Sequence, residues 1–334
     1  MKLRLSESSA CVCWMFLLLV VSCRQIPSSP SEGITTGIVT SPARPALTYY
    51  GMAKDGDSTY PAIWIADTNA QNQTAIYVAT SNSLNLAFPS WTPSGNSICF
   101  TQCGMGIVPD TIKAVDVSSR TGTVPFLRRV RPIIGLSKPG SRYEISGLGA
   151  TLGYAFCSST LNLNMIAYTA SNMDTITLCV IPITGGTPRV LCSSLNSEMN
   201  DYCAWSPDDS HLAYCRLDPP FGNNVIMIFN TSDWTCVDSI HVSGIIEGLS
   251  WSRGAMNKLV FSRASTFDSP YYLYYWDPKT TAIPTTNGVI GEAPCWSPDN
   301  SSIVCYNSGL MKVTPYTKNA VMVDPTIHSS VNWK

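Results

Sequence analysis

The feature that most constrains the fold is a repeated motif, in which a tryptophan precedes a polar turn and an apolar strand. It reads CWSPDNSSIVCYN at 295–307 and recurs as AWSPDDSHLAYCR at 204–216, SWTPSGNSICFTQ at 90–102 and, more weakly, SWSRGAMNKLVFSR at 250–263. Trp205, Trp251 and Trp296 are spaced by roughly 45 residues, a period typical of units that bury their apolar faces only against copies of themselves. The chain is therefore expected to stack several copies of one unit.

The wider interval between Trp91 and Trp205 requires a further copy between these two anchors. We place its anchor at Phe156, because the following Ile166-Ala167-Tyr168 matches Leu212-Ala213-Tyr214 of the next copy. A second apolar run follows Phe156 and the anchors Trp91, Trp205 and Trp251 at nearly the same distance. This regularity supports the placement.

Each unit is expected to contain four short antiparallel strands. The tryptophan ends the first strand, and Ser-Pro-Asp makes a tight turn, because proline fixes φ and Asp tolerates turn geometry. ALTYYGM at 46–52 is expected to be a second strand, whose first strand, SSVNWK, lies at the other end of the chain. The predicted fold is all-β: a six-bladed β-propeller of four-stranded antiparallel blades, closed by the C-terminal strand completing the N-terminal blade.

Three stretches, WSPDDSHLAY, WSPDNSSIV and ITGGTPRVL, resemble the repeats of the TolB-type, WD-repeat-like propeller family. The resemblance covers about residues 46–334. It implies a six-bladed extracytoplasmic propeller that binds proteins or other envelope components. Few residues separate Cys23 from the first strand, so we expect no counterpart of TolB's separate N-terminal domain and carry over no partner specific to TolB.

Residues 1–22 are interpreted as a lipoprotein signal peptide. Lys2 and Arg4 precede an apolar run that is too short to cross a bilayer. The run ends in Val20-Val21-Ser22-Cys23, which resembles a lipobox and indicates lipid attachment at Cys23. An uncleaved anchor, or an ordinary signal in which Cys23 is incidental, is the alternative. Residues 23–45 are expected to be a flexible Ser/Pro/Thr-rich tether and 46–334 the propeller. The expected location is the bacterial cell envelope, lipid-anchored on the periplasmic or outer-membrane side.

The charge content argues against several functions. Only 13% of residues are charged and the net charge is −1, so nothing indicates a nucleic-acid partner, and membrane contact is expected through the lipid alone. His211, His241 and His328 are scattered over different repeats, and Asp208-Asp209 fits a turn. No catalytic signature appears. We expect no cofactor, no metal and no catalysis, while a site assembled across several blades is left open.

Ten cysteines lie in the predicted propeller, where export permits disulfides. Several occupy strand positions at which other repeats carry small or apolar residues, so we expect mostly free, buried thiols. One or two bridges are left open, and Cys99 and Cys103 are the nearest pair. The ten are Cys99, Cys103, Cys157, Cys179, Cys192, Cys203, Cys215, Cys236, Cys295 and Cys305.

Two segments are candidates for recognition. The first, FLRRVRPIIGLSKPGSRYEISG at 126–147, is interpreted either as a solvated loop or as a basic lip that attracts an acidic partner. Its cations, set against the single acid Glu144, are Arg128, Arg129, Arg131, Lys138 and Arg142. The second, PYYLYYWD at 270–277, fits packing between blades or an exposed platform for sugar rings. We therefore expect a monomeric, noncatalytic scaffold that holds an envelope protein or peptide through its propeller loops. The alternative is a glycan-binding or lyase-like surface propeller, which could take an anionic glycan.

Overall fold

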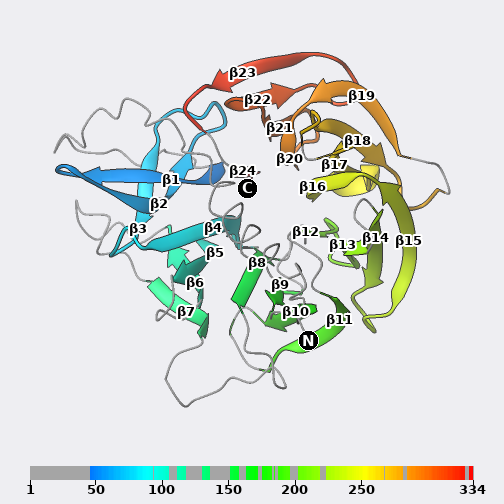
Figure 1. Ribbon diagram of the computed structural model, residues 1–334, viewed down its shortest axis with the longest axis horizontal. Coiled ribbons are helices and arrows are strands. Elements are labelled where there is room, and N and C mark those ends of the chain that lie inside the picture. Colours follow the sequence, from blue (N-terminus) through cyan, green and yellow to red (C-terminus); the bar gives the residue numbers. More distant parts are fainter. Residues whose placement is uncertain are drawn as a thin grey trace, which may run out of the picture.

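The computed structural model describes residues 46–92, 94–104, 111–117, 130–135, 151–157, 163–171, 175–182, 184, 187–195, 202–218, 223–266, 268–280, 284–327 and 331–333. These residues form six four-stranded antiparallel sheets. Figure 1 shows the sheets arranged as blades around a common centre. A three-residue 3₁₀ helix, η2 (Gly254–Met256), lies between two of the described strands. The expected six-bladed β-propeller is confirmed.

The blades follow one another along the chain. From the innermost strand outward, the first is β24 (Val331–Trp333), β1 (Leu47–Asp55), β2 (Ser58–Ala66) and β3 (Thr74–Val78), and the second is β4 (Leu84–Trp91), β5 (Ser97–Gly104), β6 (Thr111–Asp116) and β7 (Val130–Gly135). The third is β8 (Thr151–Cys157), β9 (Met165–Ser171), β10 (Thr175–Pro182) and β11 (Arg189–Leu195), and the fourth is β12 (Tyr202–Trp205), β13 (His211–Asp218), β14 (Asn223–Asn230) and β15 (Cys236–Ser243). The fifth is β16 (Ile245–Trp251), β17 (Leu259–Ala264), β18 (Tyr272–Trp276) and β19 (Thr285–Ile290), and the sixth is β20 (Glu292–Trp296), β21 (Ile303–Tyr306), β22 (Leu310–Val313) and β23 (Ala320–Asp324).

The C-terminal strand closes the ring as expected. β24 pairs with β1, placing Trp333 opposite Leu47, and each innermost strand contacts the innermost strand of the next blade around the full circle. A polar bridge adds to this closure: Tyr49 donates to Gln73 at 2.8 Å, and Gln73 donates to Asp324 of the sixth blade at 2.7 Å. The first and last blades are thus held together by both backbone and side chains.

The anchor tryptophans lie between neighbouring blades. Trp91, Trp205, Trp251, Trp296 and Trp333 are all at most 6% exposed. Trp251 also donates its indole N–H to the carbonyl of Ala204 in the preceding blade, at 2.8 Å. Burying one large ring in each of these five junctions explains why the motif recurs, because a blade alone would leave these apolar faces in water.

The Ser-Pro-Asp turns stabilise the structure in the same way in two blades. Asp208 accepts hydrogen bonds from Ser206 at 2.6 Å and Ser210 at 2.7 Å, and Asp299 repeats this with Ser297 and Ser301. The last residue of each turn reaches the preceding blade. Asp209 accepts from the backbone N–H of Leu163, and Asn300 hydrogen-bonds both the N–H and the carbonyl of Arg253. The turns therefore also join neighbouring blades.

Two details of the sequence interpretation need correction. In the third blade Ile166 lies opposite Cys157 rather than Phe156, so the residue at the anchor position is one place later than expected. A register shift between Leu152 and Ala155 accompanies this offset. The segment 126–147 is also not a loop throughout, because Val130–Gly135 forms β7, the outermost strand of the second blade.

The cysteines for which side chains are described form no disulfide. Six of them are buried, as expected for small apolar core residues, whereas Cys192 is half-buried and Cys236 is exposed. The suggested bridge between Cys99 and Cys103 is wrong, because both lie in the single extended strand β5. Four residues of strand separate their backbones by about 13 Å, beyond the reach of a disulfide.

Candidate functional site

Most of the residues singled out from the sequence lie outside the described part of the chain. Cys23, Arg128, Arg129, Lys138 and Arg142 are among these. The backbone of Arg131 is described, and it lies in β7 opposite Ala114 of β6. Lipid attachment and the basic binding segment therefore stay predictions.

The turn that contains His211 brings together a serine, a histidine and an aspartate. Ser210 Oγ lies 2.7 Å from His211 Nδ1 and donates to Asp208. A hydrolytic triad needs the histidine between serine and aspartate, whereas here the serine is in the middle. The equivalent turn of the sixth blade has the same hydrogen bonds with Ser302 in place of the histidine, so the arrangement belongs to the turn.

The aromatic strand at 270–277 packs mainly between blades. Leu273, Tyr275 and Trp276 are buried. Tyr274 stacks on Phe261, with ring centroids 5.8 Å apart. Tyr272 alone in this strand is substantially exposed, at 37%. The strand is therefore not the sugar platform considered above.

An exposed tyrosine from the next blade lies over this buried aromatic strand. Tyr316, in the turn between β22 and β23, is 45% exposed and has a left-handed backbone with φ of 60°. Its ring contacts Tyr275 and Trp296, at centroid distances of 4.6 and 6.2 Å. Asn287 holds the turn by donating to the carbonyl of Thr317 and to the hydroxyl of Tyr275. A bulky residue at positive φ is unusual and is maintained here by contacts from two blades.

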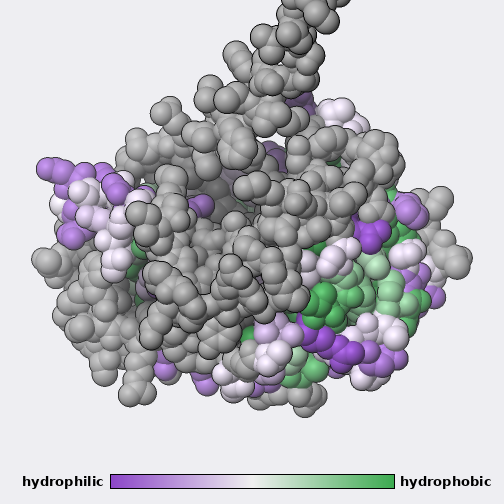
Figure 2. Space-filling model, turned by 60° about the horizontal axis from the view of Figure 1, so that its bottom comes forward, coloured by the Kyte–Doolittle hydropathy of each residue, from purple (hydrophilic) through white to green (hydrophobic). Residues whose placement is uncertain are grey.

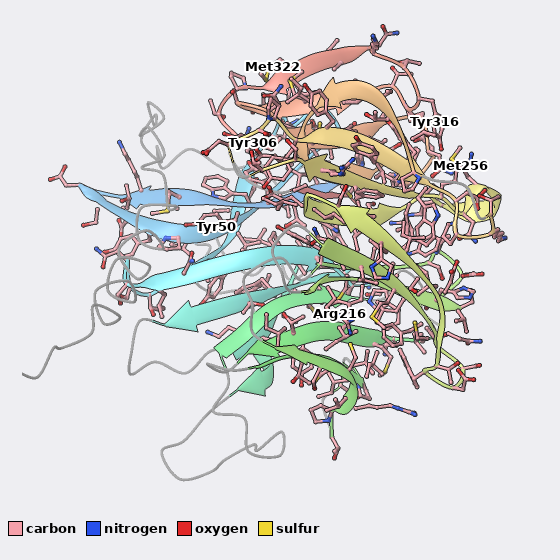
Figure 3. The ribbon with its side chains drawn as sticks, turned by 45° about the vertical axis from the view of Figure 1, so that its right-hand side comes forward. Tyr50, Arg216, Met256, Tyr306, Tyr316 and Met322 are labelled. Carbon is pink, nitrogen blue, oxygen red and sulfur yellow. The ribbon has the colours of Figure 1, made fainter. Side chains whose placement is uncertain are left out.

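Two residues of the fifth blade complete this surface. The hydroxyl of Tyr316 donates to Met256 Sδ at 3.7 Å, and Lys258 Nζ lies 5.2 Å from the centroid of the ring. Met256 is 37% exposed. We refer to Met256, Lys258 and Tyr316 as the Tyr316 surface; Figure 3 shows Met256 and Tyr316 on the same side of the molecule. On the face drawn in Figure 2, the visible described side chains are a mixture of apolar and hydrophilic residues.

A second candidate is a pair of acids on neighbouring innermost strands. Glu247 of β16 and Glu292 of β20 each lie four residues before an anchor tryptophan. Gly248, with φ of +74°, allows close approach of the two strands, since a Cβ there would lie 2.6 Å from Ala293 Cα. Burial, reinforced by the charge of Glu292, raises the pKa of Glu247 to about 7. A carboxyl group that titrates near neutrality has a suitable pKa for general acid or base chemistry.

Sequence reasoning missed both candidates. A signal for the acids exists, because Asp201, Glu247 and Glu292 all stand four residues before an anchor tryptophan in three consecutive repeats. Asp201 lies outside the described residues. The Tyr316 surface had no such signal, because it joins two turns that are about 60 residues apart in the chain.

Among the residues that the structure describes, no three His, Cys, Asp or Glu side chains come together as a metal ion would require. Within the described ranges, no helix has both the length and the apolar character of a membrane span.

Comparisons with known proteins identify the class of fold and no family. No family model matches the sequence, and no curated protein is detectably similar. TolB from Acinetobacter baumannii superposes with a TM-score of 0.58 at 14% identity; the match covers 86% of this chain and 66% of TolB. A chain in the crystal structure of a nidogen/laminin complex gives a TM-score of 0.59 at 11% identity, covering 87% of this chain and 98% of that one.

A third solved structure, an oligogalacturonate lyase in complex with manganese, is less similar. Its TM-score is 0.49 at 11% identity, and the match covers 77% of this chain and 72% of the lyase. At such identities these likenesses show the fold alone. The chain is a six-bladed β-propeller similar in fold to TolB.

Proposed function

We propose that the protein is a noncatalytic scaffold of the bacterial envelope, which holds a partner protein through the turns and loops of its propeller. The observation that carries this proposal is the Tyr316 surface. Tyrosine and methionine are enriched in protein interfaces, and tyrosine is one of the commonest hot-spot residues. Methionine adds an adaptable contact that suits an apolar side chain of a partner.

A protein is favoured over a glycan as the ligand of this surface. Tyr275, Trp296 and Lys258 already contact the ring of Tyr316, so little of a flat face is left for a sugar ring to stack on. The hydroxyl and the rim of the ring, together with Met256, are better suited to insertion among the side chains of another protein.

The proposed location rests on the N-terminal sequence and on the likeness to TolB. In the proposal, Cys23 carries the lipid and residues 23–45 give the propeller reach from the membrane. Cys23→Ala should release the protein from membranes or block its maturation. Unchanged membrane fractionation, with no lipid mass on Cys23, would contradict this part of the proposal.

The basic segment at 126–147 is proposed to attract an acidic surface of the partner. Replacing Arg128, Arg129 and Arg131 together by Ser should weaken binding and flatten its salt dependence, because fewer charges then steer association. If the affinity and the salt dependence of the triple variant match those of the wild type, the segment is ordinary solvated surface.

The central test begins with capture of partners from detergent-solubilised envelope, followed by affinity measurements with purified partner. Tyr316→Ala should weaken binding by at least about tenfold, as expected for a hot-spot residue. Tyr272→Ala is a control of similar exposure, 37%, because Tyr272 lies at the start of β18, three residues before the Tyr275 that contacts Tyr316. Equal affinity of the Tyr316 variant and the wild type would refute the proposal, and a glycan array that finds a sugar ligand dependent on Tyr316 would favour the alternative.

A further inference from the structure

Lys113 is a half-buried cation at the junction between the first and second blades. It lies in β6 opposite Phe100 of β5. Its ammonium donates to Gln102 Oε1 at 2.9 Å and to the hydroxyl of Tyr77 at 3.3 Å. Tyr77 in turn donates to the same oxygen of Gln102 at 2.6 Å. The lysine therefore belongs to a fixed polar network that spans two blades.

This network contains no negative charge. Both hydrogen-bond partners of Lys113 among the described residues are neutral oxygens. Burial lowers the pKa of Lys113, and no carboxylate contributes to offset that effect. Moving an ammonium group out of water is costly unless an anion compensates for it, so proteins usually pair such a group.

Aromatic rings fix the position of the ammonium. Lys113 Nζ lies 5.5 Å from the centroid of Tyr77, in cation–π contact. Phe100 packs against Tyr77 with centroids 4.8 Å apart. Tyr77 and Lys113 are both only half-buried, so the network can be reached from solvent. Neighbours from both blades thus hold the ammonium group in place.

We propose that Lys113 receives a carboxylate from an acidic segment of the partner protein, at the junction of the first two blades. This inference rests on the proposed function and names a second contact for the same partner. It agrees with the register of the second blade, since β7, which belongs to the basic segment, pairs directly with β6. An acidic peptide is favoured over an anionic glycan because the ring of Tyr77 is already engaged by Lys113 and Phe100.

The test uses two probes, a fluorescein-labelled oligoglutamate peptide and an oligogalacturonate of similar charge, titrated at increasing salt. Wild-type protein should bind the peptide with salt-dependent affinity. Lys113→Met should weaken that binding by at least about tenfold, because the charge is lost, whereas Lys113→Arg should retain most of it. Lys279→Met is the matched control, since it removes an exposed cation from a turn of the fifth blade.

Lys113→Met should fold, since methionine keeps the length of the aliphatic stem and removes the desolvated charge. Its midpoint of thermal unfolding should therefore equal or exceed that of the wild type. If Lys113→Met does not fold, Lys113→Gln replaces it in the same titration.

Three results would overturn the inference: no binding of the peptide to wild type, equal binding by wild type and the uncharged variant, or binding of the oligogalacturonate alone. A failure of the proposed function can be told apart from a failure of this inference alone. A captured partner that needs Tyr316 but not Lys113 refutes only this inference, whereas one that needs neither refutes both.

Discussion

Replacing Glu247 by Gln should make the protein more stable at alkaline pH. The side chain is largely buried, and its pKa is raised from 4.5 to about 7 by burial and by the charge of Glu292. Above pH 7 the native protein must therefore keep a carboxylate where a neutral group would be more favourable. Glutamine is close to isosteric with the protonated acid and removes this penalty.

The sign follows from proton binding. Between pH 4.5 and about 7 the native state holds a proton on Glu247 that the unfolded state has released. The free energy of unfolding therefore decreases as pH rises through this range, and the contribution of Glu247 is constant above it. At about 1.4 kcal/mol per pKa unit, the loss is at most about 3.5 kcal/mol, and some residual contact of the side chain with water reduces it.

The assay is urea unfolding of wild type and Glu247→Gln at several pH values between 4.5 and 8.5. The difference in unfolding free energy should be small at the acid end and favour the variant increasingly up to pH 7. Asp57→Asn, at the exposed tip of the β1–β2 hairpin, controls for the loss of one negative charge. Glu292→Gln should also reduce the pH dependence, because it removes the like charge.

A difference between wild type and Glu247→Gln that is independent of pH would refute the reasoning. It would mean that Glu247 titrates at its ordinary pKa in the native protein. A variant that loses stability with rising pH as the wild type does would lead to the same conclusion.

Three further predictions concern the ring. Trp333→Ala should destabilise the protein by about 3–5 kcal/mol in chemical unfolding, because it empties the junction that closes the circle. Trp234→Ala is the control, since Trp234 is half-buried in a turn. If Trp333→Ala costs no more stability than Trp234→Ala, β24 does not have this role. Asn300→Ala should cost about 1–2 kcal/mol, because it removes two hydrogen bonds to the backbone of Arg253 in the preceding blade, and an unchanged unfolding midpoint would show that this bridge adds nothing. Hydrogen bonds from Ser297 and Ser301 hold the pKa of Asp299 at about 2, so the stabilising effect of this carboxylate should disappear as pH falls from 3.8 to about 2. Asp299→Asn should therefore unfold with a weaker acid dependence than the wild type. If the acid transition of the variant is unaltered, Asp299 does not have this lowered pKa.

The sequence by itself determined the repeat architecture. The blades are encoded locally: in two of them proline and aspartate specify the turn, and alternating apolar residues specify the strand that follows. Since the unit recurs, its period also gave the blade number, and the lone strand ending at Trp333 could complete only the N-terminal blade. These inferences needed no knowledge of distant contacts.

The tertiary structure decided what depends on neighbours in space. The one-residue offset at Cys157 comes with a register shift between paired strands, which composition does not show. Likewise, Tyr316 meets Met256 and Lys258 only because the turns of two blades converge. The raised pKa of Glu247 and the unpaired charge of Lys113 arise from burial and from the groups that surround each side chain. Packing between blades creates those environments, because the repeat specifies each blade but not the variable side chains that meet where two blades join.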